Sequence, residues 1–355
     1  MCGLETIKTK HTTIYLSDTL KDLSRLIRPY REIVLLCDEN TRALCLPALL
    51  HDVPKLRSAL ILEIPSGEAY KNIETCSQLW STALQENISR EALWINVGGG
   101  VICDLGGFTA ATYKRGIRFI NIPTTLLAQI DATVGGKLGV DHNHVKNAIG
   151  LFQEPALVFI NPVFLKTLPD AEVYSGFAEM LKHALIASEI QWNALKKTNP
   201  LRIGKHLHLI RESLLIKKNI VTKDPLERNL RKVLNFGHTL GHALESAALS
   251  AGRPLRHGHA VALGMLMEAY LSNKKMGMPK AQLHQVQNTI LKHFCDYFSE
   301  DLKEMNWKAW ITHDKKAAAG SLNFTLLHSI GNPVINVNCA MTLVEEAVDV
   351  VWQLI

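Results

Sequence analysis

The chain has 355 residues, of which 47% are hydrophobic and 20% are charged, and its formal net charge is +6. Two domains with separate cores fit this length, and the composition excludes a disordered protein. The basic residues form no dense block with interleaved aromatics, so we do not expect the protein to bind nucleic acid. Neither a signal peptide nor an apolar run of about 18 residues occurs, so we expect a cytoplasmic protein that does not bind a membrane.

The first half of the chain alternates short apolar runs with helical stretches. We expect strands in residues 33–40, 59–67, 92–100 and 119–125, each ending in turn-forming residues. This alternation predicts a doubly wound α/β domain with a parallel sheet. Ligands of such sheets bind at the carboxyl ends of the strands, so this half is a candidate nucleotide-binding domain.

Three consecutive glycines, Gly98, Gly99 and Gly100, follow the apolar run LWINV and precede a segment that can continue as a helix. Glycines let backbone N–H groups approach a diphosphate at a helix N-terminus. The spacing is not GxGxxG, and a structural tight turn is the alternative. Polar residues at the ends of the other strands could bind ribose and phosphate, although each alone could be only a turn residue: Asp38, Asn40, Ser66, Gly67, Glu68, Lys71, Thr124 and Thr125.

The second half shows helical periodicity, in segments such as GFAEMLKHALIAS and HAVALGMLMEAYLSNKKMG. Strand-like runs are rare there. The segment LKTLP, residues 165–169, combines a proline with a following aspartate that can begin a helix. We therefore place the boundary between an α/β domain, residues 1–168, and a helical domain, residues 169–355.

Histidines and one glutamate of the helical half form a candidate metal site. His238 and His242 are four residues apart, which places both imidazoles on one face of a helix. His257 opens the next helix and could return beside His238, and two imidazoles with one carboxylate suit zinc with an open position. Glu179 is the best carboxylate because its neighbours are apolar, although an exposed glutamate paired with His183 is the alternative.

A group of basic and polar residues is scattered over both halves. Most lysines of folded proteins are simply solvated on the surface, so a solvated side chain without a binding role is the alternative for each member. Lys146 and Asn147 are harder to dismiss because they follow a glycine-rich loop. Several converging cations would bind a phosphate or a carboxylate. The group is Lys137, Lys146, Asn147, Lys182, Lys217, Arg231, Asn235, Lys315 and Lys316.

Taken in order, these segments resemble those of the 3-dehydroquinate synthases, which belong to the sugar phosphate cyclases. The motifs that carry the resemblance are PSGEAYK, GGGVICDLGGFTAATYKRG, PTTLLAQIDATVGGKLGVDHNHVKNAIG, FLKTLP, SGFAEMLKH, LRKVLNFGHTLGHALE, HGHAVALGM and HDKKAAAG. The resemblance implies a Rossmann-like NAD-binding α/β domain followed by an all-α metal- and substrate-binding domain, in a homodimer. The implied cofactors are NAD+ and a divalent metal ion, Zn2+ or Co2+.

By position, the resemblance implies roles for individual residues. The implied metal ligands are Glu179, His238 and His257. Arg115 is expected to reach the substrate phosphate across the dimer. The implied substrate contacts are Asp131, Lys137, Lys146, Asn147, Lys182, Lys217, Arg231, Asn235, His242 and one of Lys315 and Lys316, of which we assign Lys316. The implied NAD-site residues are Asp38, Asn40, Glu68, Lys71, Gly99, Gly100, Thr124 and Thr125. We assign Asp104 to the NAD site as well, although its position matches a substrate contact of the family.

The implied reaction converts 3-deoxy-D-arabino-heptulosonate 7-phosphate to 3-dehydroquinate and phosphate, a step of the shikimate pathway toward the aromatic amino acids. It comprises oxidation by NAD+, β-elimination of phosphate, reduction and an intramolecular aldol closure, so NAD+ is regenerated in each turnover. The sequence departs from the family pattern, without loss of a metal ligand, at Cys103 and Val145 (often Gly), Leu138 (often Thr), His259 (often Glu) and Asn323 (often Arg).

Three other functions compete with this interpretation. A metal-dependent polyol or glycerol dehydrogenase would share the glycine-rich turn and the histidine ligands, but it has no need for Lys146, Lys182, Lys217 and Arg231 together. A sister cyclase would act on another seven-carbon sugar phosphate, such as sedoheptulose 7-phosphate. A regulatory protein would bind metal and nucleotide without turnover.

Overall fold

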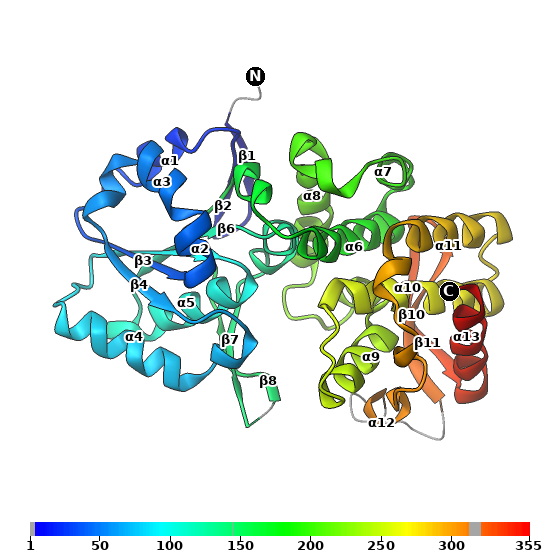
Figure 1. Cartoon of the computed structure of the whole chain (residues 1–355). Helices are drawn as coiled ribbons and strands as arrows, with labels where there is room; N and C mark the ends of the chain where they lie inside the picture. Colours follow the sequence, from blue (N-terminus) through cyan, green and yellow to red (C-terminus); the bar gives the residue numbers. More distant parts are fainter. Residues whose placement is uncertain (1–3, 144, 312–320) are drawn as a thin grey trace. The chain divides into compact units, whose positions relative to one another are not determined.

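The computed structural model describes residues 4–143, 145–311 and 321–355, and the chain divides into two compact units (Figure 1). Unit 1 comprises Met1–Pro169 and Gly204–Lys218, and unit 2 comprises Asp170–Ile203 and Asn219–Ile355. The segment Gly204–Lys218 thus belongs to unit 1, although in the sequence it follows the first part of unit 2.

Unit 1 is built on a sheet that contains all four predicted strands. Strand β1 is antiparallel to β2, and the other neighbouring strands run parallel. In the part of the chain that the structure describes, seven strands form this sheet, in the spatial order β1 (Glu5–Lys8), β2 (Thr13–Leu16), β9 (Leu157–Ile160), β6 (Arg118–Pro123), β5 (Leu93–Gly98), β3 (Ile33–Asp38) and β4 (Leu60–Ile64). A separate antiparallel hairpin pairs β7 (Lys137–His142) with β8 (Val145–Phe152).

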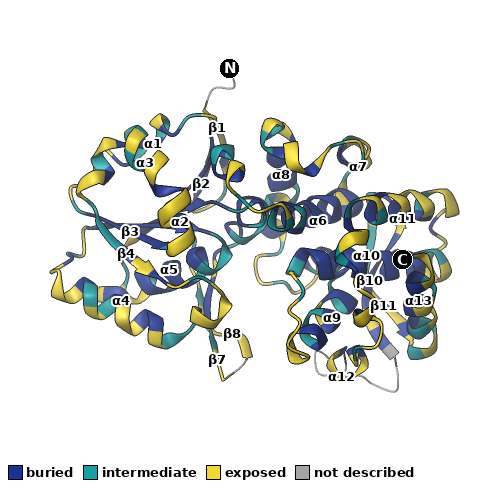
Figure 2. Ribbon diagram, in the orientation of Figure 1, coloured by how far each residue is buried: buried dark blue, intermediate teal, exposed yellow. Residues whose placement is uncertain are grey.

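Helices cover both faces of the sheet. The helices of unit 1 are α1 (Lys21–Leu26), α2 (Glu39–Leu44), α3 (Leu46–Asp52), α4 (Ile73–Gln85), α5 (Gly100–Thr112) and most of α8 (Leu207–Lys223). Along β3, Val34 and Leu36 pack in a core with α4 and α5, while Ile33 and Leu35 pack in a second core with α1 and α3. This alternation is that of a strand buried on both faces, and Figure 2 shows β3 buried. The predicted doubly wound α/β fold is confirmed.

Unit 2 is mainly helical. Its helices are α6 (Asp170–Ala187), α7 (Glu189–Leu195), α9 (His238–Ser250), α10 (His257–Met276), α11 (Lys280–Phe294), α12 (Trp307–Ile311) and α13 (Met341–Leu354). Helix α10 is the centre of this unit, because its residues 258–272 are all buried and it packs against α6, α9, α11 and α13. Among the described residues, none of the helices has the length and apolar composition needed to cross a membrane.

One hairpin in unit 2 departs from the expected all-α domain. Strands β10 (Ser321–Ser329) and β11 (Asn332–Ala340) pair antiparallel, and α10 packs against β10. The turn between them contains Gly331 at a φ of 86°, a conformation that glycine adopts without strain. Figure 1 shows this hairpin beside α13. The helical character predicted for this half is therefore correct apart from these strands.

Candidate active site

Three helices of unit 2 carry the predicted metal ligands. Glu179 lies in the middle of α6, while His238 and His257 are the first residues of α9 and α10. The start of α10 lies very close to α6, since a Cβ atom on Gly258 would be 1.9 Å from the carbonyl oxygen of Ser175. Only glycine permits this approach, which brings His257 to the helix that carries Glu179.

The three side chains converge. The Oε1 atom of Glu179 is 3.3 Å from Nε2 of His238 and 3.5 Å from Nε2 of His257. The other ring nitrogen of each histidine faces an acceptor: Nδ1 of His238 is 3.1 Å from the Phe236 carbonyl oxygen, and Nδ1 of His257 is 3.1 Å from Oε2 of Glu245. These acceptors favour a proton on Nδ1, which leaves each Nε2 as the ring nitrogen that a metal ion bound at Glu179 would take.

This donor set fits a divalent metal ion. Both carboxylate oxygens of Glu179 are buried without a hydrogen bond of ordinary geometry, and the side chain is only 1% exposed. A buried carboxylate needs compensation by a cation. One carboxylate and two imidazoles are the ligands of catalytic zinc sites that keep a position open for substrate. The residues present could therefore hold zinc or a similar ion.

His242 lies beside the same histidines, and it was predicted to contact substrate. Its ring centroid is 5.1 Å from that of His238 and 5.5 Å from that of His257. One potential ligand atom from each of these three rings lies within 4.8 Å of the others. His242 therefore stands close enough to the candidate metal position to contact a bound ligand.

Lys182 places its ammonium group beside the candidate ligands. Its ammonium nitrogen is 2.5 Å from Oε2 of Glu179, and its side chain is 2% exposed. Burial by itself would raise the pKa of Glu179, but Lys182 and His238 hold that pKa well below its usual range. Glu179 is therefore ionised at neutral pH and available as a ligand.

The histidines respond to the same electrostatic field. Burial lowers the pKa of His238, and it lowers the pKa of His242 to about 3, so both rings are neutral near pH 7. Burial also opposes the charge of His257, but hydrogen bonds to Glu179 and Glu245 raise its pKa to about 10. Without a metal ion, His257 thus carries the second cation of the cluster, and a bound metal would replace its proton.

Glu245 is a functional candidate that the sequence interpretation missed. It is the last residue of the motif HTLGHALE, seven positions after His238, and this spacing of two helical turns places it on the same face of α9. That spacing was a usable signal. Because its carboxylate accepts the Nδ1 proton of His257, it can orient a metal ligand without touching the metal.

We expect Glu245→Leu to weaken zinc binding by about 10- to 100-fold, the usual cost of removing the acceptor behind a metal-bound histidine. Glu245→Gln keeps an oxygen that can accept the same N–H, so it should lose less affinity. A competition titration against a chromogenic zinc chelator measures both. Equal zinc affinity in the Leu variant and the unsubstituted protein would contradict this role for Glu245.

In unit 1, the glycine-rich turn leads directly into a helix. Helix α5 begins at Gly100, and its N-cap, Gly99, provides no side-chain hydrogen bond. A Cβ atom on Gly98 would lie 2.5 Å from the side chain of Ile102, so this position requires glycine. Because Gly99 has no side chain, it cannot cap the first N–H groups of α5. These groups lie at the carboxyl end of β5, where a diphosphate could accept hydrogen bonds from them.

The polar residues predicted for the NAD site lie in several local environments. Asp38 caps α2 by accepting the N–H of Thr41, so its structural role is established alongside any ligand role. Asn40 and Glu68 are exposed, and Thr124 is buried. The Thr125 hydroxyl accepts the N–H of Ala128 at 3.1 Å.

Lys71, Asp104 and Asn147 form one cluster, although they were predicted partly for NAD and partly for substrate. The ammonium nitrogen of Lys71 is 2.8 Å from Oδ2 of Asp104 and 2.7 Å from Oδ1 of Asn147. Asn147 has a φ of 52°, and its N–H donates to Asp141, a residue that sequence reasoning did not single out. This cluster holds Asn147 in a strained conformation.

The remaining predicted residues fall into separate places. Lys217 pairs with Asp131, with its nitrogen 2.5 Å from Oδ1 and 2.7 Å from the backbone oxygen. Arg231 is buried and donates to the Pro225 carbonyl oxygen at 2.8 Å. Lys315 and Lys316 lie outside the described residues. Lys137, Lys146 and Arg115 are exposed, and Asn235 is half-buried at the end of the 3-10 helix Leu230–Asn235.

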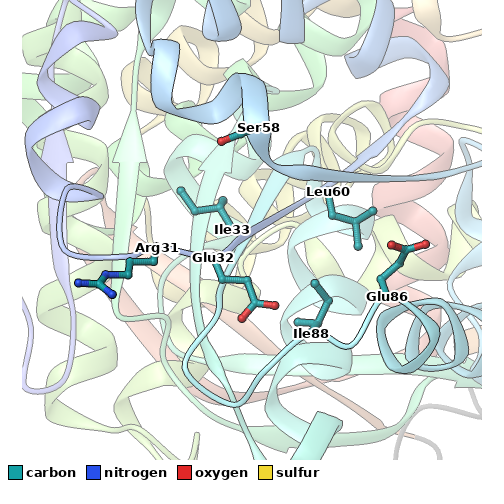
Figure 3. Close-up of a pocket in the computed structure, with 7 residues that line it drawn as sticks. All are labelled: Arg31, Glu32, Ile33, Ser58, Leu60, Glu86 and Ile88. Carbon is teal, nitrogen blue, oxygen red and sulfur yellow. The ribbon is translucent and has the colours of Figure 1, made fainter.

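A hollow of about 300 Å³ in unit 1 has none of the predicted site residues in its lining (Figure 3). It is at the amino ends of β3 and β4, where Ile33 and Leu60 begin their strands. Its polar lining includes Glu32, which accepts the N–H of Ser89 at 3.0 Å. Ligands of doubly wound sheets bind at the opposite ends of the strands, so this hollow is not a candidate nucleotide site.

Comparison with known proteins assigns the chain to a family. Residues 61–175 match the family model described as 3-dehydroquinate synthase N-terminal, and residues 176–317 match the C-terminal model of the same family. The chain belongs to the 3-dehydroquinate synthase family. A 3-dehydroquinate synthase of Parabacteroides distasonis is 42% identical over 322 residues, 90% of this chain and 91% of that protein. One of Bacillus cereus is 36% identical over 339 residues, 93% of this chain and 92% of that protein.

Solved structures show the same fold. A 2-deoxy-scyllo-inosose synthase, crystallised with carbaglucose-6-phosphate, NAD+ and Co2+, has a TM-score of 0.84 at 23% identity and covers 98% of this chain and 99% of its own. The 2-epi-5-epi-valiolone synthase of Streptomyces hygroscopicus, with NAD+ and Zn2+ bound, has a TM-score of 0.80 at 23% identity, with 99% of each chain covered. Glycerol dehydrogenase from Schizosaccharomyces pombe is less similar, with a TM-score of 0.63 at 13% identity, 99% of this chain and 92% of its own being covered. The predicted family, fold and enzyme function agree with these relatives.

Two departures from the 3-dehydroquinate synthase pattern can now be placed. Leu138 is 6% exposed and belongs to the core of unit 1, where a Cβ atom on Gly107 would lie 2.5 Å from it. His259 is 2% exposed, stacks on Tyr297 with ring centroids 4.1 Å apart, and faces the Ala171 carbonyl oxygen at 3.0 Å. Both side chains therefore pack within their own units.

Proposed function

We propose that the chain is a 3-dehydroquinate synthase that converts 3-deoxy-D-arabino-heptulosonate 7-phosphate to 3-dehydroquinate and phosphate. NAD+ and a divalent metal ion, zinc or cobalt, would be its cofactors. Its family membership supports the reaction, and the cyclases of the same fold that were crystallised with NAD+ and Co2+ or Zn2+ support the cofactors. The homodimer that the resemblance implies and the cytoplasmic location that the sequence led us to expect belong to this proposal.

We assign the metal ion to Glu179, His238 and His257. When bound there, the ion would supply Lewis-acid polarisation of substrate hydroxyl oxygens. Glu179 would hold its charge in the buried cluster because Lys182 stabilises the ionised form. His242 lies at the exposed side of this cluster and has a lowered pKa, so it would remain neutral and could donate a hydrogen bond to a substrate hydroxyl or accept one.

We assign NAD+ to residues 1–168 and the metal and substrate to residues 169–355. When bound, NAD+ would accept a hydride and return it in the same turnover. The amides at the start of α5 would bind its diphosphate, because Gly98, Gly99 and Gly100 leave the backbone open. Lys71 would place its charge beside Asp104 and Asn147, the two side chains that accept its hydrogen bonds.

The cationic side chains distinguish this reaction from polyol oxidation. Elimination releases a phosphate dianion, which requires positive charge at the site. The observation that carries the proposal is the buried Lys182 ammonium, placed 2.5 Å from the carboxylate of the candidate metal site in a chain of this family. A glycerol dehydrogenase, whose fold is related, would oxidise a neutral polyol and would gain nothing from such a cation.

The test compares substrates on the full chain with NAD+ and zinc or cobalt. We expect phosphate release from 3-deoxy-D-arabino-heptulosonate 7-phosphate and none from sedoheptulose 7-phosphate. Glycerol should give no steady accumulation of NADH. Phosphate release from sedoheptulose 7-phosphate alone would assign a sister cyclase, and steady NADH formation with glycerol would assign a dehydrogenase.

Arg115 offers a test of the proposed dimer. It is exposed, with a φ of 67°, and the resemblance places it on the phosphate of the partner's substrate. Arg115→Ala and His238→Ala should each inactivate the enzyme. If Arg115 acts across the dimer, co-expression of both variants restores one of the two sites in each mixed dimer, so purified mixed dimers should have about half of the unsubstituted activity. Failure to recover activity in purified mixed dimers would show that Arg115 does not act in this way.

A further inference from the structure

Glu268 is a buried carboxylic acid without a role in the function proposed above. It lies in α10, the helix that begins at His257, and its exposed fraction is 0%. Burial raises the pKa of its carboxyl to about 8, against the opposing effect of hydrogen bonds from backbone N–H groups. A buried acid is costly unless it is hydrogen-bonded, so its partners indicate what it does.

Those partners are at the start of α9. The Oε2 atom of Glu268 accepts the N–H of Gly237 at 2.6 Å, and Oε1 accepts the N–H of Leu240 at 3.3 Å. The N-cap of α9 is Gly237, which is left-handed, with a φ of 79°, and offers no side chain for capping. Glu268 therefore caps α9 from a neighbouring helix, and it does so next to the first residue of α9, His238.

A single peptide group links Glu268 to the ring of His238. The N–H of Gly237 and the C=O of Phe236 belong to the same peptide group, which is planar, so the direction of one sets the direction of the other. The N–H donates to Glu268, and the carbonyl oxygen is 3.1 Å from Nδ1 of His238. The contacts thus run from Glu268 through this peptide to His238, whose Nε2 faces Glu179.

The approach of α10 to this peptide is unusually close. A Cβ atom on Gly264 would lie 2.0 Å from the carbonyl oxygen of Gly237. Gly264 is one helical turn before Glu268, so the glycine permits the contact that the glutamate makes. The close packing of α9 and α10 therefore delivers a carboxylate to one particular peptide group.

We propose that Glu268 is a positioning residue for His238. By holding the peptide between Phe236 and Gly237, it keeps the proton on Nδ1 and directs Nε2 toward Glu179 and a bound metal ion. This inference rests on the proposed metal site, because His238 is assigned there as a ligand. Glu268 itself lies behind the ligand and touches neither metal nor substrate.

The experiment titrates metal-free protein with Co2+ and follows the visible absorption of the bound ion. Glu268→Met keeps the side-chain volume and removes both acceptors, and we expect it to weaken Co2+ binding about 10-fold or more, as loss of support behind a ligand does. Glu268→Gln keeps one acceptor oxygen and should fall between the Met variant and the unsubstituted protein. Long-range 1H–15N NMR of the metal-free protein should show the Nδ1–H form of His238 mixed with the other tautomer in the Met variant.

Ser272→Ala is the matched control. Ser272 is one turn further along α10 and equally buried. Its hydroxyl donates to the backbone carbonyl oxygen of Glu268 at 2.6 Å and accepts the N–H of Leu327 at 2.9 Å, so it tests the same stretch of α10 without touching the Glu268 carboxyl group. Its loss should lower the melting temperature and leave both the Co2+ affinity and the His238 tautomer unchanged. Should the Met variant not fold, the Gln variant decides by the same two readouts.

The outcomes separate this inference from the metal site on which it rests. Weaker Co2+ binding with a mixed tautomer in the Glu268 variants, and neither change in Ser272→Ala, supports the inference. Normal Co2+ affinity and an unchanged tautomer in the Glu268 variants overturn it alone. An unsubstituted protein that binds no Co2+ overturns both this inference and the proposed metal site.

Discussion

Replacing His238 with alanine is expected to lower the rate of phosphate release by about 10³-fold or more. The expectation follows from the loss of a metal ligand, since Lewis-acid catalysis contributes several kcal/mol and each 1.36 kcal/mol is tenfold in rate. His238 supplies one of the two imidazole nitrogens that face Glu179, at 3.3 Å. The measurement is continuous phosphate release with saturating NAD+, together with the metal content of the purified protein.

The control for this prediction is His284→Ala, because His284 is exposed on α11 and outside the cluster. That variant should retain both its metal and its activity. If His238→Ala releases phosphate at the unsubstituted rate, His238 is not a ligand of a catalytic metal. If it keeps its metal but loses activity, the ring acts on substrate.

Replacing Glu179 with glutamine is expected to have two effects. The metal site loses its only assigned carboxylate, so phosphate release should become undetectable. The metal-free protein should also lose about 3–5 kcal/mol of unfolding free energy, because Lys182 would remain buried beside a neutral partner. Chemical denaturation in the presence of a chelator measures the second effect without any contribution from bound metal.

A second substitution separates these two effects. Adding Lys182→Met to Glu179→Gln replaces the buried ion pair by uncharged side chains of similar size, and should restore most of the lost stability. Activity should not return, because the ligand is still missing. A double variant as unstable as Glu179→Gln would show that the ion pair is not the source of the destabilisation.

The parallel strands of unit 1 can be predicted from local sequence. The run from Ile33 to Asp38 and the run from Leu93 to Gly98 are apolar and end at turn-forming residues. Such runs are buried on both faces, so their composition differs from that of the helices around them. The spatial order of the strands does not follow from composition, because it depends on contacts between distant segments.

The hairpin β10–β11 shows a local signal that the helical periodicity of its surroundings obscured. Leu322, Phe324 and Leu326 alternate with polar residues, and Gly331 with Asn332 marks a turn. This is the pattern of a strand with one buried face. Two-residue periodicity should therefore be weighed separately in each segment, even where the neighbouring segments are helical.

The candidate metal site was predictable only in part. The pairing of His238 with His242 follows from helical spacing. Glu179 and His257 belong to other helices; their own neighbours made them candidates with open alternatives, and the family resemblance decided in their favour. The supporting groups were not found, because the contact of Glu268 with Gly237 joins two helices at a place that no local pattern marks. Glu245 was missed as well, although the sequence offered a signal for it, since it shares a helix face with His238.

The most direct test of the proposed function counts phosphate and NADH in one reaction. The full chain, loaded with zinc or cobalt and supplied with 3-deoxy-D-arabino-heptulosonate 7-phosphate in large excess over NAD+, should release many phosphate ions for each NAD+ present. No NADH should accumulate, because the hydride returns to the same substrate molecule. NADH that accumulates in step with substrate consumption while the phosphate stays bound to carbon would contradict the proposed function.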